Sequence, residues 1–158
     1  MNIQIINKNF YRDLYGFSGK IENSNFGATG LKLMDAMWKE IDARGLEPKG
    51  INYWVYEKEG IMFSGVELAH SPQDGSTLER WEINLDRYAY WKHIGSYNKL
   101  KEVNTAMRNE LTRRGIEYRY PCIEIYGHML EDESKLETEI MWALTNSIRE
   151  DVMYLRKF

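Results

Sequence analysis

The residue best suited to chemistry is Glu124, an acidic side chain within the stretch Pro121-Cys-Ile-Glu-Ile-Tyr126. This stretch has the character of a β-strand, in which residues two apart lie on one face. Glu124 therefore shares a face with Cys122 and Tyr126, while its two isoleucine neighbours point the other way. On a covered face, a carboxylate either pairs with a cation or has its pKa raised by desolvation. An exposed polar face is the simpler alternative, and spacing alone favours it.

Cysteine and histidine spacing does not favour a metal or a nucleophile site. Cys122 and His128 share a strand face but lie six residues apart, about 20 Å at about 3.3 Å per residue. That separation excludes a shared metal and a thiol–imidazole pair. Cys122 and Glu124 are close enough, but no third ligand is evident. We expect neither a metal nor a cofactor.

Composition narrows the classes of function. The chain has 158 residues, 43% of them hydrophobic, a net charge of −3 and one cysteine. An acidic chain argues against binding to a phosphate backbone, and one cysteine without a signal peptide or a long apolar run fits the cytoplasm. The 5 Trp, 11 Tyr and 5 Phe suit a surface that binds flat organic molecules, or simply an aromatic core.

An internal duplication positions these residues. The segment 36–47 aligns without a gap on 106–117, at an offset of 70. The identical pairs are Ala36/Ala106, Met37/Met107, Glu40/Glu110, Arg44/Arg114, Gly45/Gly115 and Glu47/Glu117. Both segments look like the end of an amphipathic helix that is closed by glycine. The same offset sets Trp54 against Glu124, and Tyr56 against Tyr126.

The flanking segments extend the duplication into two β-α-β-β repeats. We expect the first repeat over about 8–69, the second over about 78–145, a linker at 70–77 and a C-terminal extension at 146–158. Strands are predicted at 11–20, 51–56, 61–68, 88–94, 121–126 and 136–144. Thr29 and Ser96 fit the N-caps of the two helices. The predicted fold is a single α+β domain, an antiparallel sheet with two helices on one face.

The second repeat carries a series of motifs that resembles the GyrI-like family, the effector-binding domains of AraC- and MerR-type multidrug-responsive regulators. The motifs are Tyr88-Ala-Tyr-Trp-Lys-His-Ile-Gly-Ser-Tyr97, Arg114-Gly115, Pro121-Cys-Ile-Glu-Ile-Tyr126 and Leu136-Glu-Thr-Glu-Ile140. Each motif is short, but their order and spacing together are fairly specific. The resemblance covers roughly residues 8 to 145. Family members also occur as stand-alone proteins, which is the form expected here.

The resemblance implies a small-molecule pocket between the repeats. In the family, the glutamate that matches Glu124 lies in this pocket and faces lipophilic cations, with aromatic side chains around it. The implied function is the binding of lipophilic, often cationic, aromatic compounds, including xenobiotics. The expected ligand-binding residues are Glu124, Tyr126, Trp54 and Tyr56, with Tyr90, Trp91, Tyr97 and Trp142 as weaker candidates.

Two other functions stay open. Some GyrI-like proteins hydrolyse cyclopropane-bearing alkylators, and the same pocket with Glu124 as its catalytic group could position water and stabilise a developing cation. A gyrase-modulating interaction module would instead need an exposed apolar patch or a marked charged face. Binding without catalysis is the favoured hypothesis. The expected partners are small molecules, without direct contact to nucleic acid or membrane, and the expected state is a monomer or a weak homodimer.

Overall fold

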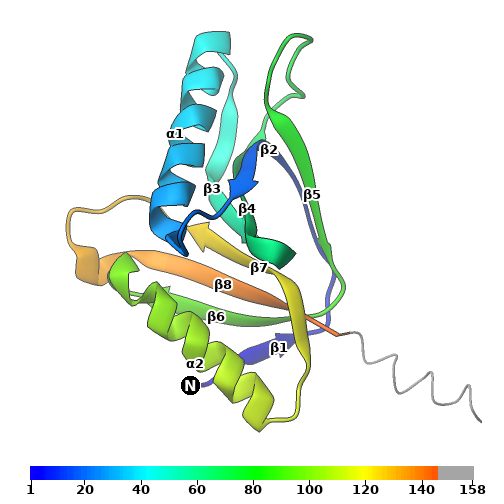
Figure 1. Cartoon of the computed structure of the whole chain (residues 1–158), viewed down its shortest axis with the longest axis vertical. Coiled ribbons are helices and arrows are strands. Elements are labelled where there is room, and N and C mark those ends of the chain that lie inside the picture. The colour runs from blue at the N-terminus through cyan, green and yellow to red at the C-terminus, as the bar shows by residue number, and fades with distance from the viewer. Residues whose placement is uncertain (146–158) are drawn as a thin grey trace, which may run out of the picture.

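The structure, a computed structural model, describes residues 1–145. In this range an eight-stranded antiparallel sheet carries two helices, α1 (Phe26–Arg44) and α2 (Leu100–Arg113), as Figure 1 shows. The strands are β1 (Gln4–Ile6), β2 (Phe10–Lys20), β3 (Pro48–Tyr56), β4 (Ile61–Leu68), β5 (Glu79–Leu85), β6 (Tyr88–Ile94), β7 (Tyr118–Tyr126) and β8 (Glu137–Leu144). The predicted α+β class is confirmed. The predicted extension at 146–158 lies outside the described residues. No helix in the described range has both the length and the apolar composition to cross a membrane.

The strand order, β1-β6-β8-β7-β3-β4-β2-β5, has the symmetry expected of a duplicated chain. The elements β1, β2, α1, β3 and β4 match β5, β6, α2, β7 and β8. If each strand is replaced by its match in the other half, the order becomes β5-β2-β4-β3-β7-β8-β6-β1, which is the same sheet read from its other edge. The axis of this pseudo-twofold symmetry therefore passes between the central strands β3 and β7. In Figure 1 the strands of the two halves run in different directions, so the sheet twists strongly across this joint.

Strands β1 and β5 were not predicted, and they connect the two halves. β1 pairs with β6 of the second half, and β5 pairs with β2 of the first. Each half thus contributes its first strand to the edge of the other half, and has one strand more than the predicted β-α-β-β unit.

The two helices repeat each other in burial as well as in sequence. Residues 31–47 and 101–117 have the same burial class at every position. Gly45 and Gly115 close the helices with φ of 61° and 73°, in the left-handed region that favours glycine. The predicted cap at Thr29 was wrong. Asn25 caps α1, and its side chain accepts a hydrogen bond from the Ala28 backbone N–H at 3.0 Å, because the helix begins one turn before Thr29.

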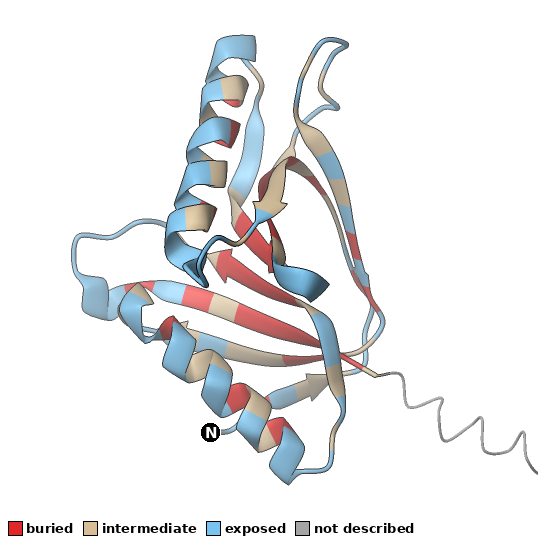
Figure 2. Cartoon of the chain, in the orientation of Figure 1, coloured by how far each residue is buried: buried red, intermediate tan, exposed pale blue. Residues whose placement is uncertain are grey.

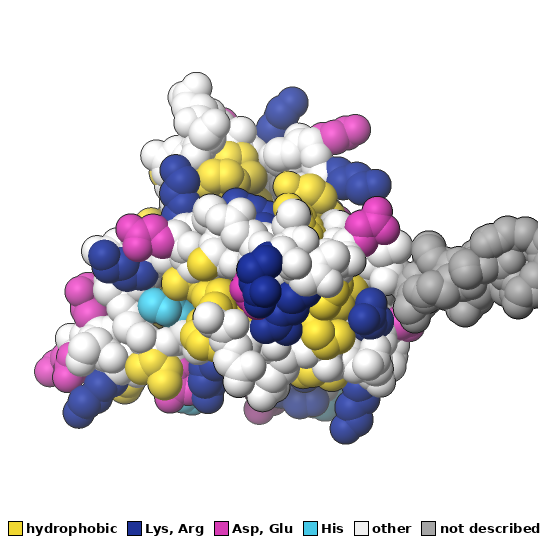
Figure 3. All heavy atoms as spheres, turned by 90° about the horizontal axis from the view of Figure 1, so that it is seen from below, with side chains coloured by type: hydrophobic (Ala, Val, Ile, Leu, Met, Phe, Trp, Pro, Cys, Tyr) yellow, Lys and Arg dark blue, Asp and Glu magenta, His cyan; other side chains and the backbone are white. Residues whose placement is uncertain are grey.

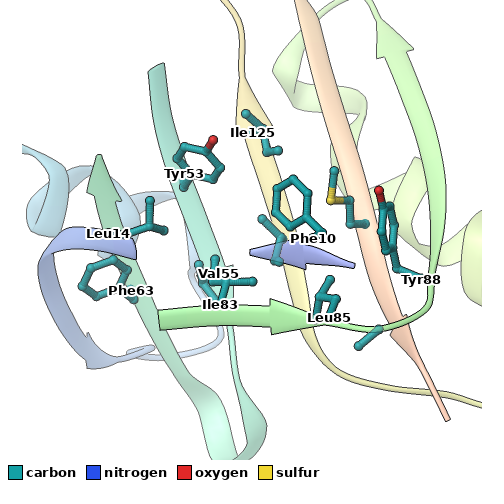
Figure 4. Packing of buried hydrophobic residues seen from close by; sticks show 12 residues of the cluster. Phe10, Leu14, Tyr53, Val55, Phe63, Ile83, Leu85, Tyr88 and Ile125 are labelled. Carbon is teal, nitrogen blue, oxygen red and sulfur yellow. The ribbon is translucent and has the colours of Figure 1, made fainter. Parts of the chain in front are cut away.

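The two faces of the sheet bury separate cores. On one face α1 packs around Met37 and Ile41, and α2 around Met107 and Leu111. On the other face the twisted ends of the sheet enclose a hydrophobic cluster, part of which is seen in Figure 4. This second cluster includes Phe10, Leu14, Tyr53, Val55, Phe63, Ile83, Leu85, Tyr88, Ile123 and Ile125. Figure 2 shows the resulting run of buried residues along β7 and β8.

Candidate functional site

The candidate site lies on the central strands, on the face that carries the helices. Trp54 on β3 and Glu124 on β7 are Cα partners across the joint between the two halves. Helix α2 reaches this pair through Asn104, whose amide donates to Glu124. Helix α1 reaches it through Gly30, which contacts the indole ring of Trp54. The pair therefore lies between the two helices, in the region between the repeats where the resemblance implied a pocket.

The Glu124 carboxylate is buried, and both of its oxygens accept hydrogen bonds from neutral donors. Its side chain is 3% exposed. Oε1 accepts hydrogen bonds from the hydroxyls of Tyr56 at 2.9 Å and Tyr126 at 2.5 Å, and Oε2 accepts one from Nδ2 of Asn104 at 2.9 Å. None of the ion pairs formed among residues 1–145 involves Glu124. The sequence left two arrangements for a covered carboxylate here, pairing with a cation or desolvation without one. The structure has the second.

Burial raises the pKa of Glu124 above its usual range, and the three hydrogen bonds oppose this shift only in part. The pKa values of the Tyr56 and Tyr126 hydroxyls are also raised, first by burial and then by the neighbouring carboxylate. Both tyrosines therefore remain protonated donors. The three donors stabilise the charged form of Glu124, but the free-energy cost of burying that charge is larger, so the net shift of the pKa is upward.

Aromatic rings enclose the carboxylate. The ring of Tyr126 lies between those of Trp54 and Tyr97. Its centroid is 5.2 Å from the Trp54 ring centroid and 5.3 Å from that of Tyr97. Tyr97 comes from the short helix η2 (Tyr97–Lys99) that leads into α2. Tyr56 packs against Phe26 at the start of α1, at 5.9 Å. All these contacts are edge-to-face, the geometry that the ring quadrupoles favour. We call Glu124, Asn104 and the rings Trp54, Tyr56, Tyr97 and Tyr126 the Glu124 site.

Asn104 was missed by the sequence analysis, although it organises the site. Besides donating to Glu124, its Oδ1 accepts hydrogen bonds from Nε1 of Trp142 at 3.0 Å and from Sγ of Cys122 at 3.4 Å. It thereby joins α2 to strands β7 and β8. The sequence did hold a signal: the offset of 70 matches Asn104 with Met34, so a polar residue replaces an apolar one on the inner face of the helix. A polar group there must find partners in the core.

The other predicted residues fall at different distances from Glu124. Trp142 is connected to Glu124 through two hydrogen bonds, one to Asn104 and one from Asn104 to the carboxylate. Trp91 packs in the α2 core on the same face of the sheet. Tyr90 lies on the opposite face, where its hydroxyl donates to Glu139 at 2.6 Å, because neighbouring strand residues point to opposite faces. The structure therefore brings Tyr56, Tyr97, Tyr126 and Trp54 to the carboxylate, but not Tyr90.

The site is closed in this structure. Trp54 is 8% exposed, and a Cβ placed on Gly30 would lie only 2.4 Å from Cζ3 of its ring. The indole thus fills the space beneath α1. Two surface depressions, of about 400 and 270 Å³, lie on the solvent side of α2 and at its C-terminal end, and no residue of the Glu124 site lines either of them.

Metal ligands do not gather in the part of the chain that the structure covers, where no three His, Cys, Asp or Glu side chains form a possible metal site. Cys122 is buried, and burial raises the pKa of its thiol well above the usual range. The thiol is therefore held in its unreactive, protonated form.

Comparisons with known proteins support the fold but give no closer relationship. No protein-family model matches the sequence, and no curated protein sequence matches it. The EcmrR C-terminal domain is similar in structure, with a TM-score of 0.73 and 14% identity over 92% of this chain and 99% of that one. SAV2435 bound to tetraphenylphosphonium has a TM-score of 0.56 and 14% identity over 94% and 97% of the two chains. A hydrolase from Listeria innocua has a TM-score of 0.57 and 9% identity over 90% and 91%. The fold that the GyrI-like resemblance implied is thus confirmed along nearly the whole described chain.

Proposed function

We propose that the Glu124 site binds a lipophilic cation with aromatic groups, held between α1 and α2 with Glu124 as its counter-charge. The observation that carries this proposal is a carboxylate that is 3% exposed, surrounded by rings, and free of any cationic partner within residues 1–145. Burying such a group costs free energy in the unliganded protein. A cation that enters the site recovers part of this cost, whereas an anion increases it.

The aromatic rings supply the second half of the recognition. A cation within about 6 Å of a Tyr or Trp face is attracted by the ring quadrupole, most strongly where water is excluded. Tyr126 and Trp54 adjoin the carboxylate directly, so one bulky cation can contact charge and rings together. That SAV2435, a protein of the same fold, binds tetraphenylphosphonium is consistent with this chemistry.

Binding requires the closed site to open. Trp54 occupies the space under Gly30, and Tyr126 fills the space between Trp54 and Tyr97. A ligand must displace at least one of these rings or move a helix outward. We therefore expect binding to change the fluorescence of Trp54.

The test compares tetraphenylphosphonium with tetraphenylborate, an ion of nearly the same shape and opposite charge. The unchanged protein is expected to bind the phosphonium and to reject the borate. Glu124→Gln keeps the shape of the side chain and removes its charge. A charge-assisted contact contributes about 1.5–3 kcal/mol, so affinity for the phosphonium should fall roughly 10- to 100-fold. Equal affinity for both ions, or no effect of Glu124→Gln, would remove Glu124 from the function.

Adding a strained three-membered-ring electrophile to this experiment separates the alternatives. A binding protein releases its ligand unchanged, whereas a hydrolase converts a strained three-membered-ring electrophile at a rate that depends on Glu124. An interaction module would bind neither ion. On the face seen in Figure 3, hydrophobic side chains form small patches separated by polar and charged ones, and this does not favour a large protein interface there.

A further inference from the structure

Two buried polar atoms in the described range lack a hydrogen-bond partner: Nε1 of Trp54 and Oγ1 of Thr138. Trp54 is 8% exposed and Thr138 is 0% exposed. A buried polar atom without a partner costs free energy, and proteins rarely contain one without a reason.

Both atoms belong to residues that adjoin Tyr126. Thr138 is the Cα partner of Tyr126 across β7 and β8. Trp54 packs on the Tyr126 ring from the β3 side, with an angle of 70° between the ring planes. The two unpartnered groups therefore lie on either side of the ring whose hydroxyl binds Glu124. Trp54 belongs to the Glu124 site and Thr138 adjoins it, which connects the unpartnered groups with what the site binds.

The contrast with Trp142 shows that an indole on this face can be satisfied. Nε1 of Trp142 donates to Asn104, which is itself bonded to Glu124. For Trp54 the Cε3–Cζ3–Cη2 edge of the ring faces Gly30, so Nε1 lies on the edge turned away from α1. An indole N–H can only donate, and a threonine hydroxyl can donate as well. The missing partner of Trp54 is therefore an acceptor.

We propose that the cation bound at the Glu124 site carries an uncharged hydrogen-bond acceptor, such as a carbonyl oxygen, and that Nε1 of Trp54 donates to it. This inference rests on the proposed function and narrows its ligand class. Glu124 selects positive charge, the rings select aromatic surface, and the indole N–H of Trp54 selects an acceptor beside the cationic centre.

The test uses two phosphonium ions of matched shape, (4-acetylphenyl)triphenylphosphonium and (4-isopropenylphenyl)triphenylphosphonium. They differ in a carbonyl oxygen replaced by a methylene group. Because a hydrogen bond contributes about 0.5–1.5 kcal/mol net, the unchanged protein should prefer the acetyl compound by about 2- to 10-fold. Trp54→Phe should abolish the preference. Trp81→Phe is the matched control, since Trp81 stacks on Phe63 instead of on the site, and it should leave the preference intact.

A second measurement does not depend on a variant that folds. In the unchanged protein, the indole ¹H–¹⁵N resonance of Trp54, assigned by through-bond correlation, should shift downfield with the acetyl compound and not with the isopropenyl one. If both compounds bind equally, or if the preference survives in Trp54→Phe, the acceptor inference is overturned while the proposed function stands. If neither compound binds, the proposed function itself fails.

Discussion

Trp54 and Glu124 are equivalent positions of the two repeats and are also Cα partners across β3 and β7. The pseudo-twofold axis therefore passes between these two residues. The backbone is symmetric at this point, but the side chains are not: one repeat supplies a carboxylate and the other an indole. A duplicated fold has in this way formed one asymmetric site on its axis instead of two identical sites.

The pH dependence of stability follows from the burial of Glu124. Its pKa is higher in the folded chain than the ordinary value of 4.5. The stabilisation that this group contributes is therefore fully present below the unfolded pKa and is lost as the pH rises through the folded pKa. In urea unfolding over a pH series, the difference in unfolding free energy between the unchanged protein and Glu124→Gln should fall as the pH rises above about 4.5. The exposed Glu102, changed to Gln, is the matched surface control.

Cation binding should have the opposite pH dependence. A proton and the bound cation compete for the same carboxylate, so affinity for tetraphenylphosphonium should rise over the same pH window in which the stabilisation by Glu124 is lost. Isothermal titration at several pH values measures this directly, and Glu124→Gln should give a flat profile. A flat profile in the unchanged protein would mean that Glu124 does not contact the cation.

Gly30→Ala tests the contact between α1 and Trp54. The new Cβ would lie 2.4 Å from the indole ring, so the ring or the helix must move. Overpacking of this kind costs about 1–3 kcal/mol, which outweighs the helix propensity of alanine, worth about 1 kcal/mol. Gly27→Ala is the control in the same helix, because its Cβ would meet only Asn25, at 4.0 Å. Thermal unfolding should show a lower Tm for Gly30→Ala alone.

Asn104→Ala should destabilise the protein by about 1–3 kcal/mol, because Nε1 of Trp142 loses its acceptor and the Glu124 carboxylate loses one donor. The exposed Asn109 on the same helix provides the control, since Asn109→Ala brings the same gain in helix propensity without these losses. Urea midpoints of the two variants, compared at one pH, measure the difference. Equal midpoints would show that Asn104 does not organise the site.

The sequence was sufficient for the parts of the structure that depend on local periodicity. The alternation around Glu124 placed it on one face with Tyr126, and the helix duplication predicted two amphipathic helices closed by glycine. It was also sufficient for β5, where Trp81, Ile83 and Leu85 alternate with polar residues, although this strand was left unassigned. The same alternation excludes Tyr90 from the site. Tyr90 and Trp91 are neighbours in one strand and must face opposite ways, so the two could not both be ligand-binding residues of one pocket.

Other features depend on contacts that no local pattern encodes. The pairing of β1 with β6 joins segments more than eighty residues apart, and a strand of three residues has too little pattern of its own. The role of Asn104 depends on the exact position of α2 above β7. The unpartnered state of Trp54 and Thr138 depends on side-chain positions throughout the site, and only the folded structure reveals it.

The exchange of edge strands determines which parts of the molecule can move. Three strand pairs join the halves: β1 with β6, β2 with β5, and β3 with β7. A hinge motion between the halves would have to break hydrogen bonds in all three, so we expect the sheet to unfold as one cooperative unit. The side chains and helices above β3 and β7 are not held in this way. We therefore expect the sheet to stay rigid when a ligand binds, and the helices and side chains above β3 and β7 to rearrange to admit it.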